Sequence, residues 1–163
     1  MIFVENFVKI LKKNKVDFFT GVPDSILKNL SLYLENFSIK KHIIAANEGA
    51  AVSVGIGYYL SRKKIPCVYF QNSGLGNAIN PLISIAHKEV YSIPLLLIIG
   101  WRGSPNQPDE PQHKAKGKIT KNLLQLLKVK HCVLKSEKDL LKLKNLIKIS
   151  YREKRIVACL IEK

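Results

Sequence analysis

Short apolar segments alternate with segments of helical periodicity along the chain, and this alternation restricts the possible folds more than any other feature. The most apolar segment, Ile93-Pro-Leu-Leu-Leu-Ile-Ile99, contains no polar side chain. A strand that lacks alternating polar positions is covered on both faces, as the strands of parallel sheets are. The pattern therefore predicts an α/β fold, a doubly wound parallel sheet flanked by helices.

The expected elements follow the chain as helices and strands in turn. We expect strands at 16–20, 42–44, 65–70, 94–99, 131–134 and 155–160. We expect helices at 4–13, from an Asp24-Ser25 cap to about 36, from an Asn47 cap to 60, from a turn at 73–76 with Ser73 as its cap to about 86, at 120–127, and after a capping box at 136–139. Residues 100–117 are expected to form a long loop. Neither a repeat nor a linker interrupts the pattern, which predicts a single domain over 1–163.

The net charge of +15 raises the question of a nucleic-acid partner. Most of the excess charge lies between Lys114 and Arg155, where lysines are separated by leucines at helical spacing. Such a pattern is typical of a solvated helix face. The segment contains no DNA- or RNA-binding motif. We therefore expect no nucleic-acid partner, although a basic field could attract an anionic substrate or an acidic subunit.

Neither a membrane span nor an export signal is expected. No apolar run approaches the roughly 20 residues that a membrane-spanning helix needs. The N-terminal segment 1–5 lacks the basic and then apolar arrangement of a signal peptide. Cys67, Cys132 and Cys159 lie in separate apolar segments without a CxxC pair, which indicates buried thiols rather than a zinc site or a disulfide framework. A cytoplasmic protein without a metal site of its own is the expectation.

Four polar or glycine-rich turns follow successive predicted strands. Ligands of doubly wound sheets bind at the carboxyl ends of the strands. We therefore expect these turns to converge on one edge of the sheet and to contain the functional residues. The turns are Gly21–Ser25, Ala45–Gly49, Gln71–Asn77 and Gly100–Gly103.

Glu48 is the most informative residue in these turns. It lies in Ala45-Ala-Asn-Glu-Gly-Ala-Ala51, where small apolar neighbours favour a partly desolvated carboxyl group. The alternative is a glutamate in the first turn of a helix that only interacts favourably with the helix dipole. The segment by itself leaves both interpretations open.

The turn Gln71–Asn77 reads Gln-Asn-Ser-Gly-Leu-Gly-Asn. Its glycines would let the backbone approach a ligand closely. The turn lacks the lysine and the Ser/Thr of a P-loop, and it lacks the full spacing of a dinucleotide-binding loop. A nucleotide site is therefore not favoured.

Six segments in order, from about Phe18 to Thr120, resemble the N-terminal domain of the phosphonopyruvate decarboxylase family. They are Gly-Val-Pro-Asp-Ser, Ala-Asn-Glu-Gly, Gln-Asn-Ser-Gly-Leu-Gly-Asn-Ala-Ile-Asn-Pro, Tyr-Ser-Ile-Pro, Gly-Trp-Arg-Gly and Asp-Glu-Pro-Gln-His. Sulfopyruvate decarboxylase alpha subunits are similar too, whereas the last two segments favour the phosphonate enzymes. The resemblance implies the fold of a thiamine-diphosphate pyrimidine-binding domain.

For Glu48 the resemblance implies binding of the aminopyrimidine ring of thiamine diphosphate. A carboxyl group that is hydrogen-bonded to a ring nitrogen favours the imino tautomer, whose neighbouring nitrogen can accept a proton from the thiazolium carbon. Further cofactor-binding positions are implied in the glycine-rich turn: Gln71, Asn72, Ser73, Gly74, Leu75, Gly76 and Asn77.

Four other residues are candidates for catalysis or substrate binding, and the resemblance places Asp24 and His113 where related decarboxylases carry active-site residues. Asp24, with Ser25 beside it, could orient the substrate or relay a proton, or it could only cap the following helix. His113 is a candidate acid or phosphonate contact, or a surface histidine. Arg102 could pair bidentately with a phosphonate, or it could brace its own loop. No role is implied for His42, His87 and His131, which are expected to be structural.

In the resembled family a second domain binds the diphosphate through magnesium and carries a Gly-Asp-Gly motif. This chain contains no Gly-Asp-Gly. We therefore expect the magnesium ligands on a partner chain within a homo- or hetero-oligomer, or else a truncated product. The implied activity is conversion of 3-phosphonopyruvate to phosphonoacetaldehyde and CO2 in phosphonate biosynthesis, only with that partner. The alternatives are a sulfopyruvate decarboxylase alpha subunit and a non-catalytic or regulatory module with the same fold.

Overall fold

The computed structural model describes residues 2–105 and 107–162, which form a six-stranded sheet with all neighbours paired in parallel. The strand order is β2-β1-β3-β4-β6-β5. The strands are β1 (Phe19–Gly21), β2 (His42–Ile44), β3 (Cys67–Gln71), β4 (Leu96–Gly100), β5 (Lys130–Leu134) and β6 (Val157–Ile161).

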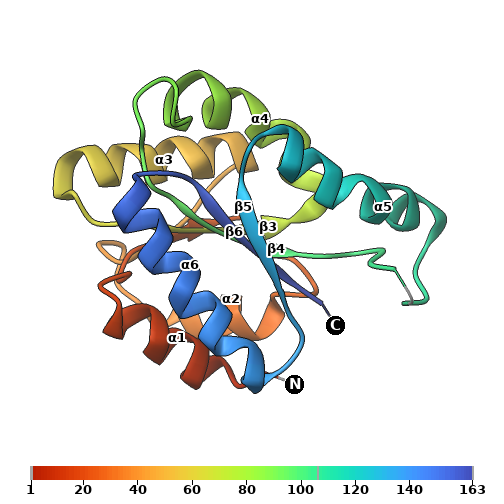
Figure 1. Cartoon of the computed structure of the whole chain (residues 1–163). Helices are drawn as coiled ribbons and strands as arrows, with labels where there is room; N and C mark the ends of the chain where they lie inside the picture. Colours follow the sequence, from red (N-terminus) through yellow and green to blue (C-terminus); the bar gives the residue numbers. More distant parts are fainter. Residues whose placement is uncertain (1, 106, 163) are drawn as a thin grey trace.

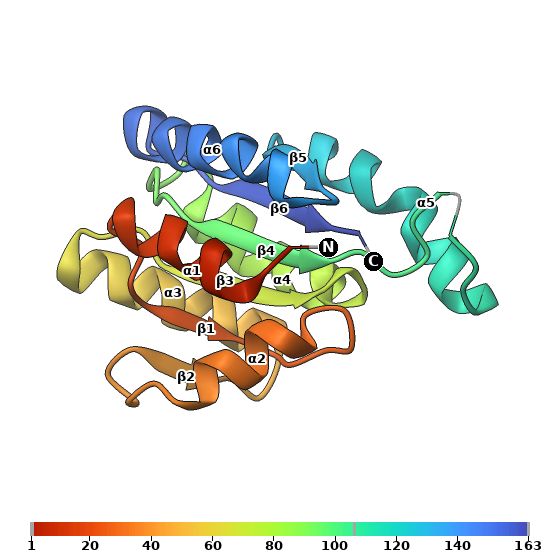
Figure 2. The same cartoon turned by 90° about the horizontal axis from the view of Figure 1, so that it is seen from below.

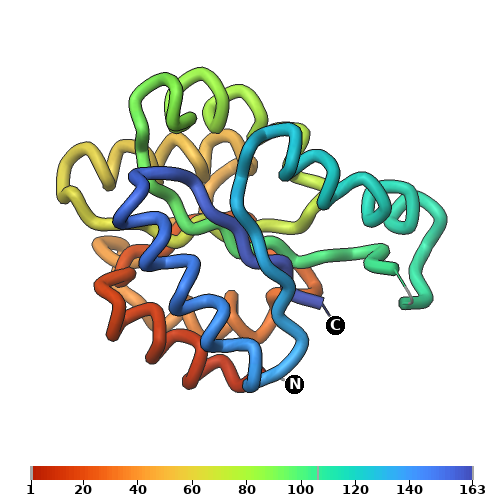
Figure 3. Tube along the Cα trace, in the orientation of Figure 1, coloured from red at the N-terminus to blue at the C-terminus, as the bar shows by residue number. Residues whose placement is uncertain are grey.

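Helices cover both faces of the sheet (Figures 1 and 2). One face carries α1 (Val4–Lys13), α2 (Lys28–Glu35) and α6 (Leu140–Glu153), and the other carries α3 (Glu48–Arg62), α4 (Leu75–Pro81) and α5 (Pro111–Leu126). Shorter turns are η1 (Asn72–Gly74), the π-helical η2 (Leu82–Ala86) and η3 (Glu137–Asp139). The predicted doubly wound α/β fold is confirmed, and Figure 3 traces how the chain crosses from one face to the other.

The two faces of β4 explain why its sequence is continuously apolar. All five residues of the strand are buried. Leu96 and Ile98 pack into the core beneath α1, α2 and α6, whereas Leu97 and Ile99 pack into the core beneath α3, α4 and α5. Alternate side chains of one strand thus contribute to two separate cores, as expected for a parallel sheet that is covered on both sides.

Two of the predicted helix caps are present. The side chain of Asn47 accepts a hydrogen bond from the backbone N–H of Ala50 at 2.8 Å, which satisfies one free donor at the start of α3. Ser136 and Asp139 form the predicted capping box before α6.

Three local predictions are wrong. The segment expected as a loop to residue 117 becomes helical at Pro111, because a proline in the first helical turn needs no N–H partner and already has a helical φ. Helix α2 begins at Lys28, since Asp24 holds a turn ahead of the helix rather than capping it. Ser73 caps no helix, because residues 72–74 form a 3-10 turn of their own before α4.

Two glycines fix α5 against the segment that leaves β4. A Cβ atom on Gly117 would overlap the backbone of Gly103, and one on Gly103 would overlap the backbone of His113. Gly103 also has a φ of 65°, in the left-handed region that favours glycine. The indole N–H of Trp101 donates to the carbonyl of Gly117 at 3.0 Å. The start of α5 is therefore tied to the carboxyl end of β4.

The basic surface predicted from the sequence is solvated. Its exposed lysines on α5 and α6 include Lys114, Lys116, Lys118, Lys121, Lys142, Lys144 and Lys148. Within residues 2–105 and 107–162, none of the helices has both the length and the apolar character that crossing a membrane requires.

We predict that Gly117→Ala lowers the free energy of unfolding by about 1–3 kcal/mol, the usual cost of overpacking, because its Cβ has no room beside Gly103. Urea denaturation followed by circular dichroism measures the change. The matched control is Gly57→Ala, at an exposed position of α3 where a Cβ meets nothing within 4 Å. That variant should gain about 0.5–1 kcal/mol. Equal stability of the two variants would contradict the packing described here.

Candidate active site

Hydrogen bonds connect the four turns that follow β1, β2, β3 and β4. The side chain of Asn77 donates to Glu48, which joins the turn after β3 to the start of α3. The side chain of Asn72 donates to the carbonyl of Arg102 at 3.0 Å, and the guanidinium of Arg102 donates to the Ser25 hydroxyl at 3.1 Å. The predicted convergence of these turns at one edge of the sheet is thereby confirmed.

Glu48 lies at the first position of α3, half-buried beside the turn after β3. Its Oε2 accepts a hydrogen bond from Nδ2 of Asn77 at 2.8 Å. A Cβ on Gly49 would come within 2.8 Å of the carbonyl oxygen of Asn77, so α3 and α4 approach closely at this point. Glu48 Oε1 has no hydrogen-bond partner among the described residues. One carboxylate oxygen is thus held in place while the other stays available.

Gly74 is the residue that makes room for this carboxylate. A Cβ atom at position 74 would overlap Cγ, Cδ and Oε1 of Glu48. The backbone of Gly74 has φ −76° and ψ −8°, which any residue can adopt. A side chain at position 74 would therefore displace the Glu48 carboxylate from this place, although it would not strain the backbone of the turn.

The remaining residues of the glycine-rich turn divide into packing and exposed positions. The Asn72 amide is buried and fully used, because it donates to the Arg102 carbonyl and the Thr120 hydroxyl and accepts from the Arg102 N–H. Leu75 belongs to the core. The Gln71 side chain donates to the Ser73 hydroxyl at 2.8 Å, and both side chains are half-buried. Gly76 and Asn77 are exposed beside Glu48.

The two carboxylate oxygens of Asp24 differ, because one stabilises a turn and the other has no hydrogen-bond partner among the described residues. Its Oδ1 accepts hydrogen bonds from the backbone N–H groups of Ile26 at 2.6 Å and Leu27 at 3.2 Å. Its Oδ2 is buried without a hydrogen-bond partner in the described part of the chain. Burial raises the pKa of Asp24, and the two backbone hydrogen bonds and the charge of Arg102 oppose that rise only in part. A Cβ on Gly100 would lie 2.9 Å from both carboxylate oxygens, so a side chain there would press against the Asp24 carboxylate.

Arg102 forms an ion pair with Asp109, a residue that was not among the predicted site residues. Its Nε donates to Oδ2 of Asp109 at 2.8 Å, and Nη2 donates to Oδ1 at 2.5 Å. The bidentate pair holds the pKa of Asp109 well below its usual range. Oδ2 of Asp109 also accepts the backbone N–H of Gly103. In this geometry Arg102 braces its own loop, which was one of its two predicted roles. The only sequence signal for Asp109 was its place in the Asp-Glu-Pro-Gln-His segment.

His113 lies in the first turn of α5 and is half-buried. Its Nδ1 is buried without a hydrogen-bond partner in the ranges that the structure describes. The backbone contact between His113 and Gly103 fixes its helix against the segment after β4. This histidine, like Asp24, therefore carries a polar atom whose hydrogen-bonding capacity the chain does not use.

The other histidines have structural contacts. Nε2 of His42 lies 2.8 Å from the hydroxyl of Tyr69, and burial lowers the pKa of His42. Nδ1 of His87 accepts the backbone N–H of Glu89, and Nδ1 of His131 lies 3.1 Å from the carbonyl of Val129.

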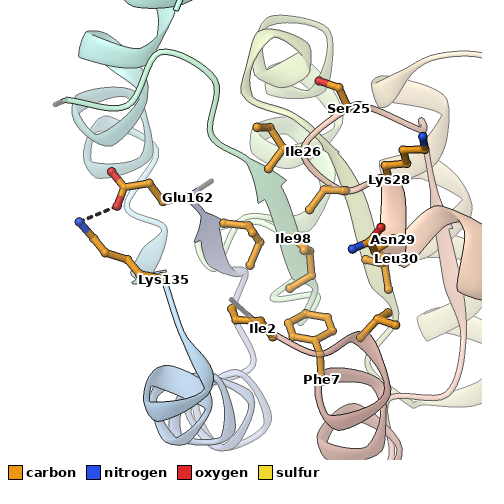
Figure 4. A pocket seen from close by; sticks show the side chains of 13 residues that line it. Ile2, Phe7, Ser25, Ile26, Lys28, Asn29, Leu30, Ile98, Lys135 and Glu162 are labelled. Carbon is orange, nitrogen blue, oxygen red and sulfur yellow. Dashed lines mark ion pairs between the residues drawn. The ribbon is translucent and has the colours of Figure 1, made fainter. Parts of the chain in front are cut away.

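A cavity of about 570 Å³ lies on the face of the sheet that α1 and α2 cover (Figure 4). Its walls are largely apolar and come from α1, the segment 25–30, β4 and β6. Lys135 and Glu162 form an ion pair of 2.5 Å beside it. Ser25 is the only predicted site residue that lines this cavity, and Glu48 does not. The cavity is therefore separate from the Glu48 carboxylate.

Comparison with known proteins assigns the chain to a family. Residues 1–127 match the model of the family described as "Thiamine pyrophosphate enzyme, N-terminal TPP binding domain". The chain belongs to this family. The match includes all four turns and the whole of α5, and it confirms the family resemblance that the six segments indicated.

Two groups of relatives are similar in sequence. A phosphonopyruvate decarboxylase from Streptomyces viridochromogenes is 41% identical over 106 residues, which cover 65% of this chain and 26% of the relative. A sulfopyruvate decarboxylase subunit alpha from Methanococcus maripaludis is 34% identical over 139 residues, which cover 85% of this chain and 81% of the subunit. The chain thus spans only about a quarter of the first relative but most of the second.

A solved structure supports the fold. The thiamine diphosphate-dependent 4-hydroxybenzoylformate decarboxylase of Rhodococcus jostii superposes with a TM-score of 0.68 at 20% identity, covering 99% of this chain and 30% of that protein. At this identity the likeness concerns the fold alone. The fold of the chain therefore matches that structure over 99% of the chain.

We predict that Asp24→Asn stabilises the fold at neutral pH. Asparagine keeps the oxygen that accepts from Ile26 and Leu27 and removes a carboxylate whose charge is disfavoured by burial. Because the folded pKa is raised, the penalty is fully present above that pKa and disappears below the unfolded value of about 4. The gain over wild type should therefore shrink on acidification through this range, as measured by urea denaturation across pH.

The matched variant Asp24→Ala removes the turn contacts as well as the charge. It should lose about 0.5–2 kcal/mol, the usual effect of deleting a side chain that bonds backbone N–H groups ahead of a helix. A loss of stability for Asp24→Asn at neutral pH would contradict the assignment of a buried, poorly solvated carboxylate.

Proposed function

We propose that this chain contributes the pyrimidine-binding half of the active site of a thiamine-diphosphate-dependent decarboxylase of small anionic 2-oxoacids. The observation that carries the proposal is the position of Glu48 against Gly74, with one oxygen fixed by Asn77 and the other available. Membership of the family that binds thiamine pyrophosphate supports the same cofactor.

The residues of this chain fit the pyrimidine end of the cofactor. Glu48 would hold it through its available oxygen, and the exposed positions Gly76 and Asn77 would lie beside it. When bound, thiamine diphosphate supplies the electron sink for loss of CO2 from a 2-oxoacid. The task of Glu48 is to hold a proton at the pyrimidine ring, and Asn77 keeps the carboxylate in one orientation for that purpose.

Asp24 and His113 are proposed to act on the substrate. Each has an atom, Oδ2 and Nδ1 respectively, that is buried and lacks a partner within the described residues. Burial raises the pKa of Asp24, which favours the protonated carboxyl group more than an exposed position would. Ser25 is proposed as a substrate contact through its hydroxyl, which already accepts a hydrogen bond from Arg102.

The diphosphate and its magnesium ion are proposed to be bound by a second polypeptide domain. The match that covers 81% of a relative named a subunit supports this proposal. We propose that the domain lies on a partner chain and that the two assemble as a hetero-oligomer. The cofactor would then lie between the two polypeptides.

For the substrate we propose 3-phosphonopyruvate, on the 41% identity to a phosphonopyruvate decarboxylase over 106 residues. The second candidate is 3-sulfopyruvate, which the extended match to an alpha subunit favours. Arg102 is already neutralised by Asp109, so recognition of the anionic group would rely on the partner or on exchange of this ion pair.

The substrate prediction is tested by expressing the chain together with the protein encoded beside it and purifying the complex. With thiamine diphosphate and magnesium present, we expect decarboxylation of 3-phosphonopyruvate in preference to 3-sulfopyruvate, measured as aldehyde release. This chain alone should release none. A complex that forms but decarboxylates neither acid would support a non-catalytic module instead.

The role of Glu48 is tested with two variants of that complex. Glu48→Gln should lower kcat by at least about 100-fold, as expected when a group that controls proton transfer is lost. Gly74→Ala should weaken thiamine diphosphate binding by about ten-fold or more, because its Cβ displaces the carboxylate and removes one charge-assisted hydrogen bond. Gly57→Ala, in the same helix as Glu48, is the matched control and should bind the cofactor normally. Wild-type turnover by Glu48→Gln would refute the assignment.

A further inference from the structure

Two of the three cysteines lie opposite each other on neighbouring strands. Cys132 of β5 is paired in register with Cys159 of β6, and their Sγ atoms are 3.6 Å apart. Neighbouring strands are about 4.8 Å apart. That spacing falls within the Cα–Cα separation of roughly 4.4–6.8 Å at which disulfides form. The two thiols therefore lie at a separation that a disulfide can bridge.

The environments of the two thiols differ. Cys159 is completely buried, and burial raises its pKa well above the ordinary value. Cys132 is half-buried, so the prediction that all three thiols are buried is wrong for this residue. The hydrogen bond shared with the Cys159 thiol lowers the pKa of Cys132, whereas burial raises it, and the charges of Lys142 and Asp139 act in opposite directions.

We propose that Cys132 and Cys159 form a reversible intramolecular disulfide when the protein meets hydrogen peroxide, with Cys132 as the thiol that is oxidised first. This pair is a modification site independent of the proposed decarboxylase activity. The geometry selects it because a partly accessible thiol lies in contact with a second thiol that can resolve its oxidised form.

Hydrogen peroxide is the only oxidant that disulfide formation between these thiols requires. The Cys132 thiolate attacks one oxygen of the peroxide, the O–O bond breaks, and a sulfenic acid and one water are formed. The Cys159 sulfur then attacks Sγ of Cys132, and the sulfenic oxygen leaves as a second water with the remaining protons. Two thiols and one peroxide thus give one disulfide and two waters.

Cys67 serves as the internal reference for this pair. It lies on β3, which is separated from β6 by the whole of β4 in the sheet. Two strand spacings of about 4.8 Å each exceed the range that a disulfide can span. Cys67 is also fully buried, and burial strongly raises its pKa. It should therefore stay reduced under conditions that oxidise the other two.

The disulfide would join the edge strand β5 to β6. These strands lie at the opposite side of the sheet from β2, the strand that leads into Glu48. Oxidation should therefore leave the contact between Glu48 and Asn77 unchanged. Its direct effect is to prevent β5 from separating from the sheet.

The test is mass spectrometry of the full chain after brief treatment with hydrogen peroxide. We expect the loss of two hydrogen masses and a cross-linked peptide that contains Cys132 and Cys159, both reversed by dithiothreitol. Alkylation after oxidation should label Cys67 alone once the protein is unfolded. Addition of oxygen masses at Cys132 without a cross-link would overturn the proposal, and so would a cross-link that involves Cys67.

Cysteine variants distinguish the proposed cross-link between Cys132 and Cys159 from oxidation elsewhere in the protein. Cys67→Ala should form the cross-link at the wild-type rate, whereas Cys132→Ser should not form it. In Cys159→Ala we expect Cys132 to stop at an oxygenated form that a sulfenic-acid reagent traps. If either of the last two variants fails to fold, the peptide map of the wild-type protein still decides which sulfurs are joined. A cross-link retained in Cys132→Ser would refute the assignment.

Discussion

The Glu48 carboxylate fits beside the turn after β3 because residue 74 has no Cβ atom. The same type of close contact recurs along this edge of the sheet. Gly100 leaves space for the Asp24 carboxylate, and Gly103 and Gly117 bring α5 against the end of β4. At each of these positions the residue has no side chain, so a carboxylate or a backbone segment can approach closely. The arrangement of the site therefore depends on glycines as much as on the polar residues themselves.

The sequence predicted the fold well because burial on both faces leaves a clear pattern in the strands. The apolar run of β4 supplies alternate side chains to two cores, and a run without alternation is the signal of that situation. Strand ends were predicted less well, since hydrogen bonding and not apolarity sets them. Helix α5 was missed over its first turns because prolines and a glycine suggested a loop. Pro111 instead begins the helix, and Gly117 permits its packing.

The sequence indicated that the turns after four strands meet at one edge of the sheet, but not the contacts between them. The strand order brings the turns that contain Asp24 and Glu48 to that edge. The bidentate partner of Arg102 and the full use of the Asn72 amide depend on three-dimensional geometry between separate segments. The sequence left two roles open for Arg102, anion binding and bracing of its loop, and in the structure it braces its loop through Asp109. Recognition of the anionic group of the substrate would then rely on the partner chain or on exchange of the Arg102–Asp109 ion pair.

The central claim is that Glu48 holds the pyrimidine ring of thiamine diphosphate, and an experimental structure of the assembled complex with the cofactor tests it most directly. We predict that a Glu48 carboxylate oxygen lies within hydrogen-bond distance, about 2.6–3.2 Å, of a pyrimidine nitrogen. Gly74 should remain in contact with the same carboxylate. A cofactor bound with its pyrimidine ring beyond reach of Glu48 would contradict the account.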